Sequence, residues 1–165
     1  MGVAFGKRVG DALNKQVTEE LSSAYLYLAM SNVLRDMGLE GCAGWVMQRS
    51  KEELDHAMKI LMHIQERSTK IKLQPIAAPK QEWRAPLHIF EEMFRNEQRI
   101  TSLVMSIYEY SIVEKDYQTQ CFISWFVQKQ VEKESAATSI LDRLKKMQST
   151  DIGVIMFDKE LSQRK

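Results

Sequence analysis

The chain has 165 residues, and its 23 Lys and Arg almost cancel its 22 Asp and Glu. This length suits a single domain, residues 1–165, and the balanced charge favours neither nucleic acid nor an anionic membrane as a partner. The apolar runs are too short to cross a bilayer, and the start of the chain lacks the pattern of a secretory signal. Two cysteines, Cys42 and Cys121, cannot build a disulfide framework. We therefore expect a cytoplasmic protein with free thiols.

Apolar residues recur with helical periodicity in long blocks, and alternating strand patterns are missing. Gly38 stops the first block, Pro86 is a favourable first-turn residue for the third, and Asp116 suits the N-cap of the fourth. The predicted helices cover about 6–37, 41–68, 86–113, 116–147 and 152–161. The apolar stripe of the first helix is expected to comprise Val9, Leu13, Val17, Ala24, Tyr27, Leu28 and Leu34.

The connections predict the topology. The first and second helices, and the third and fourth, are joined by only a few residues, so each pair should form an antiparallel hairpin. The middle connection, about Thr69 to Ala85, is long enough to span about 55 Å and so to run the length of the molecule. It would make the second and third helices parallel. The predicted fold is all-α: a four-helix bundle with one long crossover and a short fifth helix.

Polar side chains interrupt the apolar stripe near the middle of every long helix. Glu20 lies on the first helix, Glu53 and His56 on the second, Glu97 on the third, and Gln130 and Lys133 on the fourth. Buried carboxylates at one level repel each other unless cations or protons neutralise them. Glu53 and His56 are spaced i, i+3, so both can reach one ion, and oxygen with imidazole ligands suits iron, manganese or zinc. His63 and His88 lack partners at ligand spacing and are expected to be structural, as are Trp45 and Trp125.

At these positions the sequence resembles the bacterial non-haem ferritins. The resemblance rests on LNKQVTEELSSAYLYLAMS (13–31), SKEELDHAMKILMHI (50–64), FEEMFRNEQRIT (90–101), EKDYQTQCFISWFVQKQVEKE (114–134) and FDKEL (157–161). It implies an iron-storage subunit with ferroxidase activity, in which two Fe(II) ions are oxidised by dioxygen or hydrogen peroxide. Fe(III) then moves to a mineral inside a homo-oligomeric cage, typically of 24 subunits.

The resemblance also implies site roles. Glu20, Glu53 and His56 resemble the ligands of the first iron, with Glu53 bridging to a second iron held by Glu97. Gln130 matches a glutamine beside the centre, Tyr27 a tyrosine that can hydrogen-bond a ligand or supply an electron, and Trp125 a nearby tryptophan. Haem is not expected, because Leu54 stands where bacterioferritins carry their haem-binding methionine.

Two lysines depart from the family pattern. Lys133 occupies a position where many bacterial ferritins have a glutamate for the second iron. Its ammonium either pairs with Glu97 and fills the space of the second ion, or extends outward into solvent. Lys129 replaces a carboxylate of a third iron site, to which Glu52 and Glu132 belong, so that site should be weak or missing.

Two functional alternatives follow from these departures. One is a cage subunit with impaired or absent ferroxidase activity, and the other is a di-metal oxidase or peroxidase that forms no mineral. Glu114 and Asp116, at the turn before the fourth helix, are expected either to line an acidic pore that admits iron or to lie in a solvated turn.

Overall fold

The computed structural model describes residues 4–67 and 69–164. Within these ranges the chain forms five helices and no strand. They are α1 (Lys7–Asp36), α2 (Glu40–Glu66), α3 (Pro86–Val113), α4 (Tyr117–Met147) and α5 (Asp151–Ser162). Their ends lie close to the predicted ones. The predicted end of the second helix at Ser68 lies outside the described residues.

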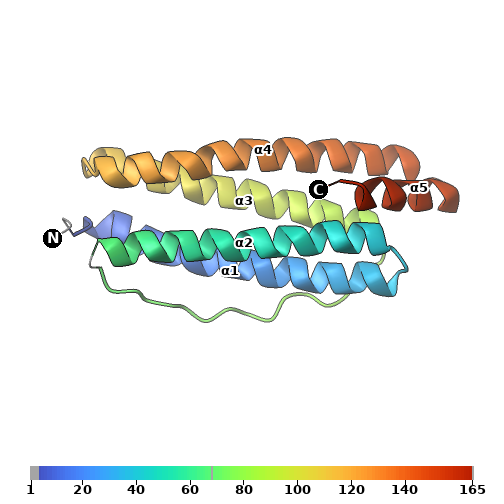
Figure 1. The fold of residues 1–165 in the computed structure, drawn as a ribbon, viewed down its shortest axis with the longest axis horizontal. Coiled ribbons are helices and arrows are strands. Elements are labelled where there is room, and N and C mark those ends of the chain that lie inside the picture. Colours follow the sequence, from blue (N-terminus) through green and yellow to red (C-terminus); the bar gives the residue numbers. More distant parts are fainter. Residues whose placement is uncertain (1–3, 68, 165) are drawn as a thin grey trace.

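The four long helices form two antiparallel pairs, α1 with α2 and α3 with α4 (Figure 1). The segment of residues 69–85 runs along the outside of the α1–α2 pair and returns the chain to the end of the molecule where α2 began. Consequently α2 and α3 run in the same direction, and α5 packs at that same end. This is the predicted bundle with one long crossover.

Local signals explain where the helices begin and end. Gly38 has a φ of +75°, a left-handed conformation that costs glycine little, and α1 ends two residues before it. Pro86 occupies the first position of α3, where its missing N–H costs no helical hydrogen bond. The Asp116 carboxylate accepts a hydrogen bond from the Thr119 amide and so caps α4.

The apolar core consists of two clusters of buried side chains. The cluster near α5 includes Tyr27, Met30, Val46, Phe90, Met93, Ile140 and Phe157, and the other includes Leu13, Val17, Ile60, Ile100, Val104, Ile123 and Phe126. On each long helix, the polar positions Glu20, Glu53, Glu97 and Gln130 lie between members of the two clusters. The fold therefore places one polar layer between two dry regions.

One residue assigned to the buried stripe is in fact at the surface. Leu28 is 37% exposed, whereas its neighbour Tyr27 is fully buried. Consecutive residues on an α-helix point about 100° apart, so a stripe that includes Tyr27 turns Leu28 away from the core. The sequence assignment of Leu28 was wrong for this reason.

The crossover and α5 are each held by specific hydrogen bonds. The Asn14 side chain accepts from the Lys72 amide at 2.7 Å, and the Trp83 indole donates to Glu92 at 2.7 Å. The fifth helix is held against α2 by Asp158, whose carboxylate accepts a hydrogen bond of 2.7 Å from the Cys42 amide in the first turn of α2. None of the helices in the described ranges is long and apolar enough to cross a membrane.

Candidate metal centre

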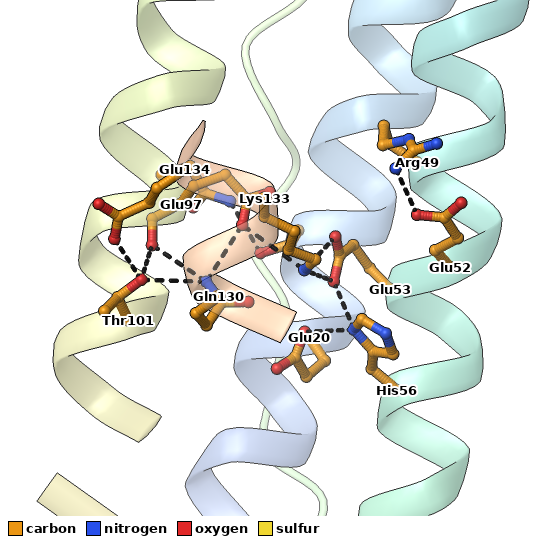
Figure 2. A network of polar contacts seen from close by, with 12 residues as sticks. Glu20, Arg49, Glu52, Glu53, His56, Glu97, Thr101, Gln130, Lys133 and Glu134 are labelled. Atoms are coloured by element: carbon orange, nitrogen blue, oxygen red, sulfur yellow. Dashed lines mark hydrogen bonds and ion pairs between the residues drawn. The ribbon is translucent and has the colours of Figure 1, made fainter. Parts of the chain in front are cut away.

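Glu20 from α1 and Glu53 and His56 from α2 converge in the polar layer (Figure 2). Their exposed fractions are 1%, 1% and 9%. His56 Nδ1 lies 3.0 Å from Glu53 Oε2 and 3.9 Å from Glu20 Oε2, and one ligand atom from each residue lies within 4.8 Å of the others. Donor atoms bound to one ion at about 2.0–2.2 Å are separated by roughly 3–4 Å, and the two distances from His56 Nδ1 lie in this range, so the group is a candidate site for a single metal ion.

The electrostatics of this triad favour a cation. Glu20 Oε2 is buried and has no hydrogen-bond partner. Burial and the neighbouring Glu53 raise the pKa of Glu20 well above its usual value. Burial also acts to raise the pKa of Glu53, but the hydrogen bond with His56 and the charge of Lys133 outweigh it and lower that pKa to about 2. A buried carboxylate whose charge is disfavoured and whose oxygen is unpaired is a suitable ligand for a metal.

Lys133 points into the bundle. Its side chain is 9% exposed, and its Nζ lies 2.6 Å from Glu53 Oε1, 2.7 Å from Glu53 Oε2 and 3.5 Å from Glu97 Oε2. Burial acts to lower the pKa of Lys133, but Glu53, Glu97 and Glu20 outweigh burial and raise it, so the side chain stays charged. Of the two orientations left open by the sequence, the structure has the inward one, with Glu53 as a closer partner than Glu97.

Glu97 lies on the far side of Lys133 from the triad (Figure 2). Its Oε1 accepts a hydrogen bond from the Tyr27 hydroxyl at 2.5 Å, and its Oε2 accepts from the Gln130 amide at 3.2 Å. Burial raises the pKa of Glu97, and burial together with the charge of Glu97 raises the pKa of Tyr27. The structure thus brings Tyr27 and Gln130 to Glu97, and the ammonium of Lys133 lies between Glu97 and Glu53.

Comparisons with known proteins identify the family to which this fold belongs. The ferritin-like domain family matches residues 10–147. A bacterial non-heme ferritin of Bacteroides fragilis is 34% identical over 158 residues, which cover 96% of this chain and 98% of that protein. One from Campylobacter jejuni is 32% identical, covering 92% and 91%. An open pore ferritin from the archaeon Archaeoglobus fulgidus superposes with a TM-score of 0.94 at 35% identity and covers 98% of both chains. The chain belongs to the ferritin family.

The family binds iron, and the Glu20, Glu53 and His56 group is the candidate site for it in this ferritin. The ligand positions are supported by residues that the sequence reasoning missed. Gln16 donates to Glu20 at 2.8 Å, and Asn96 donates to the Tyr27 hydroxyl at 3.0 Å. Gln16 lies four residues before Glu20, so helical spacing contained this signal, whereas the contact of Asn96 with Tyr27 depends on the packing of α3 against α1.

Glu52 and Glu132, the expected remnants of a third iron site, each pair with a cation of their own helix in this ferritin. Arg49 lies 2.9 Å from Glu52, and Lys129 lies 2.6 Å from Glu132, both at i, i+3 spacing. The two carboxylates are 30% and 65% exposed, so water also solvates them. Neither belongs to the buried triad (Figure 2 shows the Arg49–Glu52 pair apart from it).

Aromatic rings pack against the imidazole of His56. The rings of Trp125 and Phe126 lie edge-on to it, with centroid distances of 5.4 and 5.7 Å. The ammonium of Lys59 lies 3.7 Å from the centroid of Trp125 on α4. The rings of Trp125 and Phe126 pack against the imidazole, which is 9% exposed, and so shield it from water. His63 stacks on Phe122 with parallel rings whose centroids are 4.0 Å apart, a packing contact that agrees with the structural role expected for it.

Glu114 and Asp116 are both engaged within the ferritin subunit. Glu114 accepts hydrogen bonds from two backbone amides in the first turn of α1, at 3.1 and 3.2 Å. Asp116 caps α4 and pairs with Arg67 at 2.9 Å, and its side chain is 7% exposed. The solvated-turn interpretation is therefore wrong for Asp116, and the pore interpretation stays a prediction.

Proposed function

We propose that this ferritin is an iron-storage subunit that binds Fe(II) at Glu20, Glu53 and His56, oxidises it to Fe(III), and stores it as mineral inside a homo-oligomeric cage of 24 subunits. The observation that carries the proposal is the buried triad, with the unpaired Oε2 of Glu20 facing the imidazole of His56. The electrons come from Fe(II), and dioxygen or hydrogen peroxide accepts them.

The residues of this chain account for each requirement of that function. Carboxylate oxygens and an imidazole suit iron, and anionic ligands stabilise Fe(III) relative to Fe(II) because the product carries more positive charge. Gln16 holds Glu20 in place from the same helix, and the rings of Trp125 and Phe126 hold His56. The two apolar clusters on either side exclude bulk water from the polar layer.

The surface supports assembly with further copies of the chain. Large apolar side chains are exposed on every helix and on the crossover, among them Tyr25, Leu28, Leu54, Met58, Met62, Leu73, Ile76, Met105, Ile112, Val131, Ile152, Ile155 and Met156. Exposed apolar groups in such number are typical of protein–protein interfaces. We propose that neighbouring subunits cover them.

Aerobic addition of Fe(II) to the assembled protein tests the proposal. The near-ultraviolet absorbance of Fe(III) should rise quickly with the wild type and at least tenfold more slowly with Glu20→Gln, which keeps the contact of residue 20 with Gln16 but removes a charged ligand. Glu66→Gln, at an exposed position of α2, is the matched control and should behave as the wild type.

Equal rates for the wild type and Glu20→Gln would reject the ferroxidase function and favour a cage subunit without it. Rapid oxidation in which the Fe(III) does not co-elute with the protein on size-exclusion chromatography would instead favour an oxidase or peroxidase that forms no mineral.

A further inference from the structure

The charges in the polar layer match one divalent ion. Glu20, Glu53 and Glu97 supply three negative charges when ionised, and Lys133 supplies one positive charge. Their sum is −2, which a single divalent cation neutralises. Two divalent cations would leave an excess of +2 in a dry interior, and an uncompensated buried charge is strongly unfavourable.

The ammonium of Lys133 also fills the place between the carboxylates. It contacts both oxygens of Glu53, at 2.6 and 2.7 Å, and lies 3.5 Å from Glu97 Oε2. An ion bound to Glu53 and Glu97 together, with ligand distances of about 2.0–2.2 Å, would have to lie where the ammonium is. The second position expected from the family is thus taken by a side chain of the protein (Figure 2).

The side of Glu53 that faces Glu20 and His56 differs from the side that faces Lys133 and Glu97. There Glu20 Oε2 is buried without a hydrogen-bond partner, and His56 Nδ1 lies 3.9 Å from it and 3.0 Å from Glu53 Oε2. Each carboxylate oxygen has two lone pairs, so Glu53 can keep the ammonium on one side while an ion binds on the other. Within residues 4–67 and 69–164, no lysine or arginine forms an ion pair with Glu20, although the charge of Lys133 acts to lower its pKa from a distance.

We infer that the centre takes one divalent ion, at Glu20, Glu53 and His56, and that the ammonium of Lys133 permanently holds the position of a second ion between Glu53 and Glu97. This inference rests on the proposed function for the existence of the first site. It makes Lys133 the residue that sets the metal stoichiometry of the centre.

Zn(II), which undergoes no oxidation, is the probe for the test. Crystals of the assembled protein soaked in Zn(II) should show one anomalous peak inside each bundle, at the triad. Lys133→Glu should show two peaks, because the change removes the ammonium and adds a carboxylate ligand. Calorimetric titration should give one more ion per subunit for this variant than for the wild type.

Lys133→Gln is a second variant, which keeps the acid content of the layer unchanged in case Lys133→Glu does not fold. It should also gain a second peak, between Glu53 and Glu97. Lys145→Glu makes the same charge change at an exposed position of α4 and should keep one peak.

Two peaks in the wild type would overturn the inference and leave the proposed function standing. A single peak in every folded variant at position 133 would also overturn it. No peak in the wild type would overturn the proposed function, and this inference with it.

Discussion

The ammonium of Lys133 is expected to stabilise the bundle in the absence of metal, since it lies within 3.5 Å of two buried carboxylates. Removing one partner of a buried ion pair costs about 3–5 kcal/mol, because the other charge is left uncompensated. Lys133→Met should therefore lower the Tm of the metal-free protein by on the order of 10 °C, measured by calorimetry with a chelator present.

A control variant distinguishes the loss of this buried ion pair from a general loss of positive charge. Lys145→Met, at an exposed position, should change the free energy of unfolding by no more than about 0.5 kcal/mol. Zn(II) should recover part of the lost Tm in Lys133→Met, because the ion replaces the missing positive charge. A Tm equal to that of the wild type in chelator would show that the carboxylates do not need the ammonium.

At the scale of the elements, two glycines on α2 should respond oppositely to the same substitution. A Cβ on Gly41 would overlap the backbone carbonyl of Asp158, whereas a Cβ on Gly44 would meet no atom within 4 Å. Gly41→Ala should push α5 away from α2 and destabilise the fold by about 1–3 kcal/mol. Gly44→Ala should stabilise it by about 0.5–1 kcal/mol, since alanine is the better helix former.

Thermal unfolding of the two alanine variants measures these effects, and hydrogen exchange locates them. Faster exchange should appear in α5 for Gly41→Ala only. Equal Tm values for both variants would mean that α5 is not seated against Gly41 in solution.

A second contact between elements should depend on pH. Asp116, in the turn between α3 and α4, pairs with Arg67 at the end of α2. Burial acts to raise the pKa of Asp116, but hydrogen bonds from Arg67 and Thr119 outweigh it and lower the pKa below its usual 3.8. Because the folded-state pKa is the lower one, the pair stabilises the fold above about pH 4, and this contribution is lost as the pH falls through the lowered value.

Asp116→Asn tests this linkage, because asparagine keeps the N-cap of α4 but removes the charge. Its Tm should lie below that of the wild type at pH 6, and the gap should narrow as the pH is lowered past 3.8. Asp142→Asn, at an exposed position of α4, should show no such gap. If the difference in Tm between Asp116→Asn and the wild type did not depend on pH, it would be due to packing and not to the charge of Asp116.

The helix ends and the contacts between helices differ in how far sequence predicts them. Gly38, Pro86 and Asp116 act through their own backbone or the next turn, so they can be interpreted without knowing the fold. The capping of α1 by Glu114, and of α2 by Asp158, joins residues more than 100 positions apart. Such contacts follow only from the packed arrangement.

In the candidate site, too, some features can be predicted from sequence and others depend on the packed fold. Helical periodicity was enough to place Glu20, Glu53 and Glu97 at one level of the bundle, because stripe positions repeat every seven residues. It was not enough to orient Lys133, whose flexible four-carbon stem can carry the ammonium inward or out to solvent. The carboxylates on the facing helices attract the ammonium into the bundle, and their positions around it depend on the tertiary fold.

At the scale of the whole molecule, assembly should depend on apolar groups on the outer face of α1. Tyr25 and Leu28 lie three residues apart, share one face of the helix, and are 46% and 37% exposed. Replacing both by lysine should disrupt any interface that buries them, since unpaired charges oppose the desolvation that association requires. A cage of 24 subunits of 19.2 kDa has a mass of about 460 kDa, so light scattering after size-exclusion chromatography distinguishes it from smaller species.

The wild type should elute at the mass of the cage, and the Tyr25→Lys, Leu28→Lys double variant as a smaller species with unchanged helical circular dichroism. Ser102→Lys, which adds a charge at an exposed position of α3, should assemble as the wild type does. The bundle buries its own core, so loss of assembly without loss of helix would separate subunit folding from cage formation. A double variant that still elutes as a cage would show that this face of α1 stays open to solvent, and that other exposed apolar groups, such as those of α5, hold the subunits together.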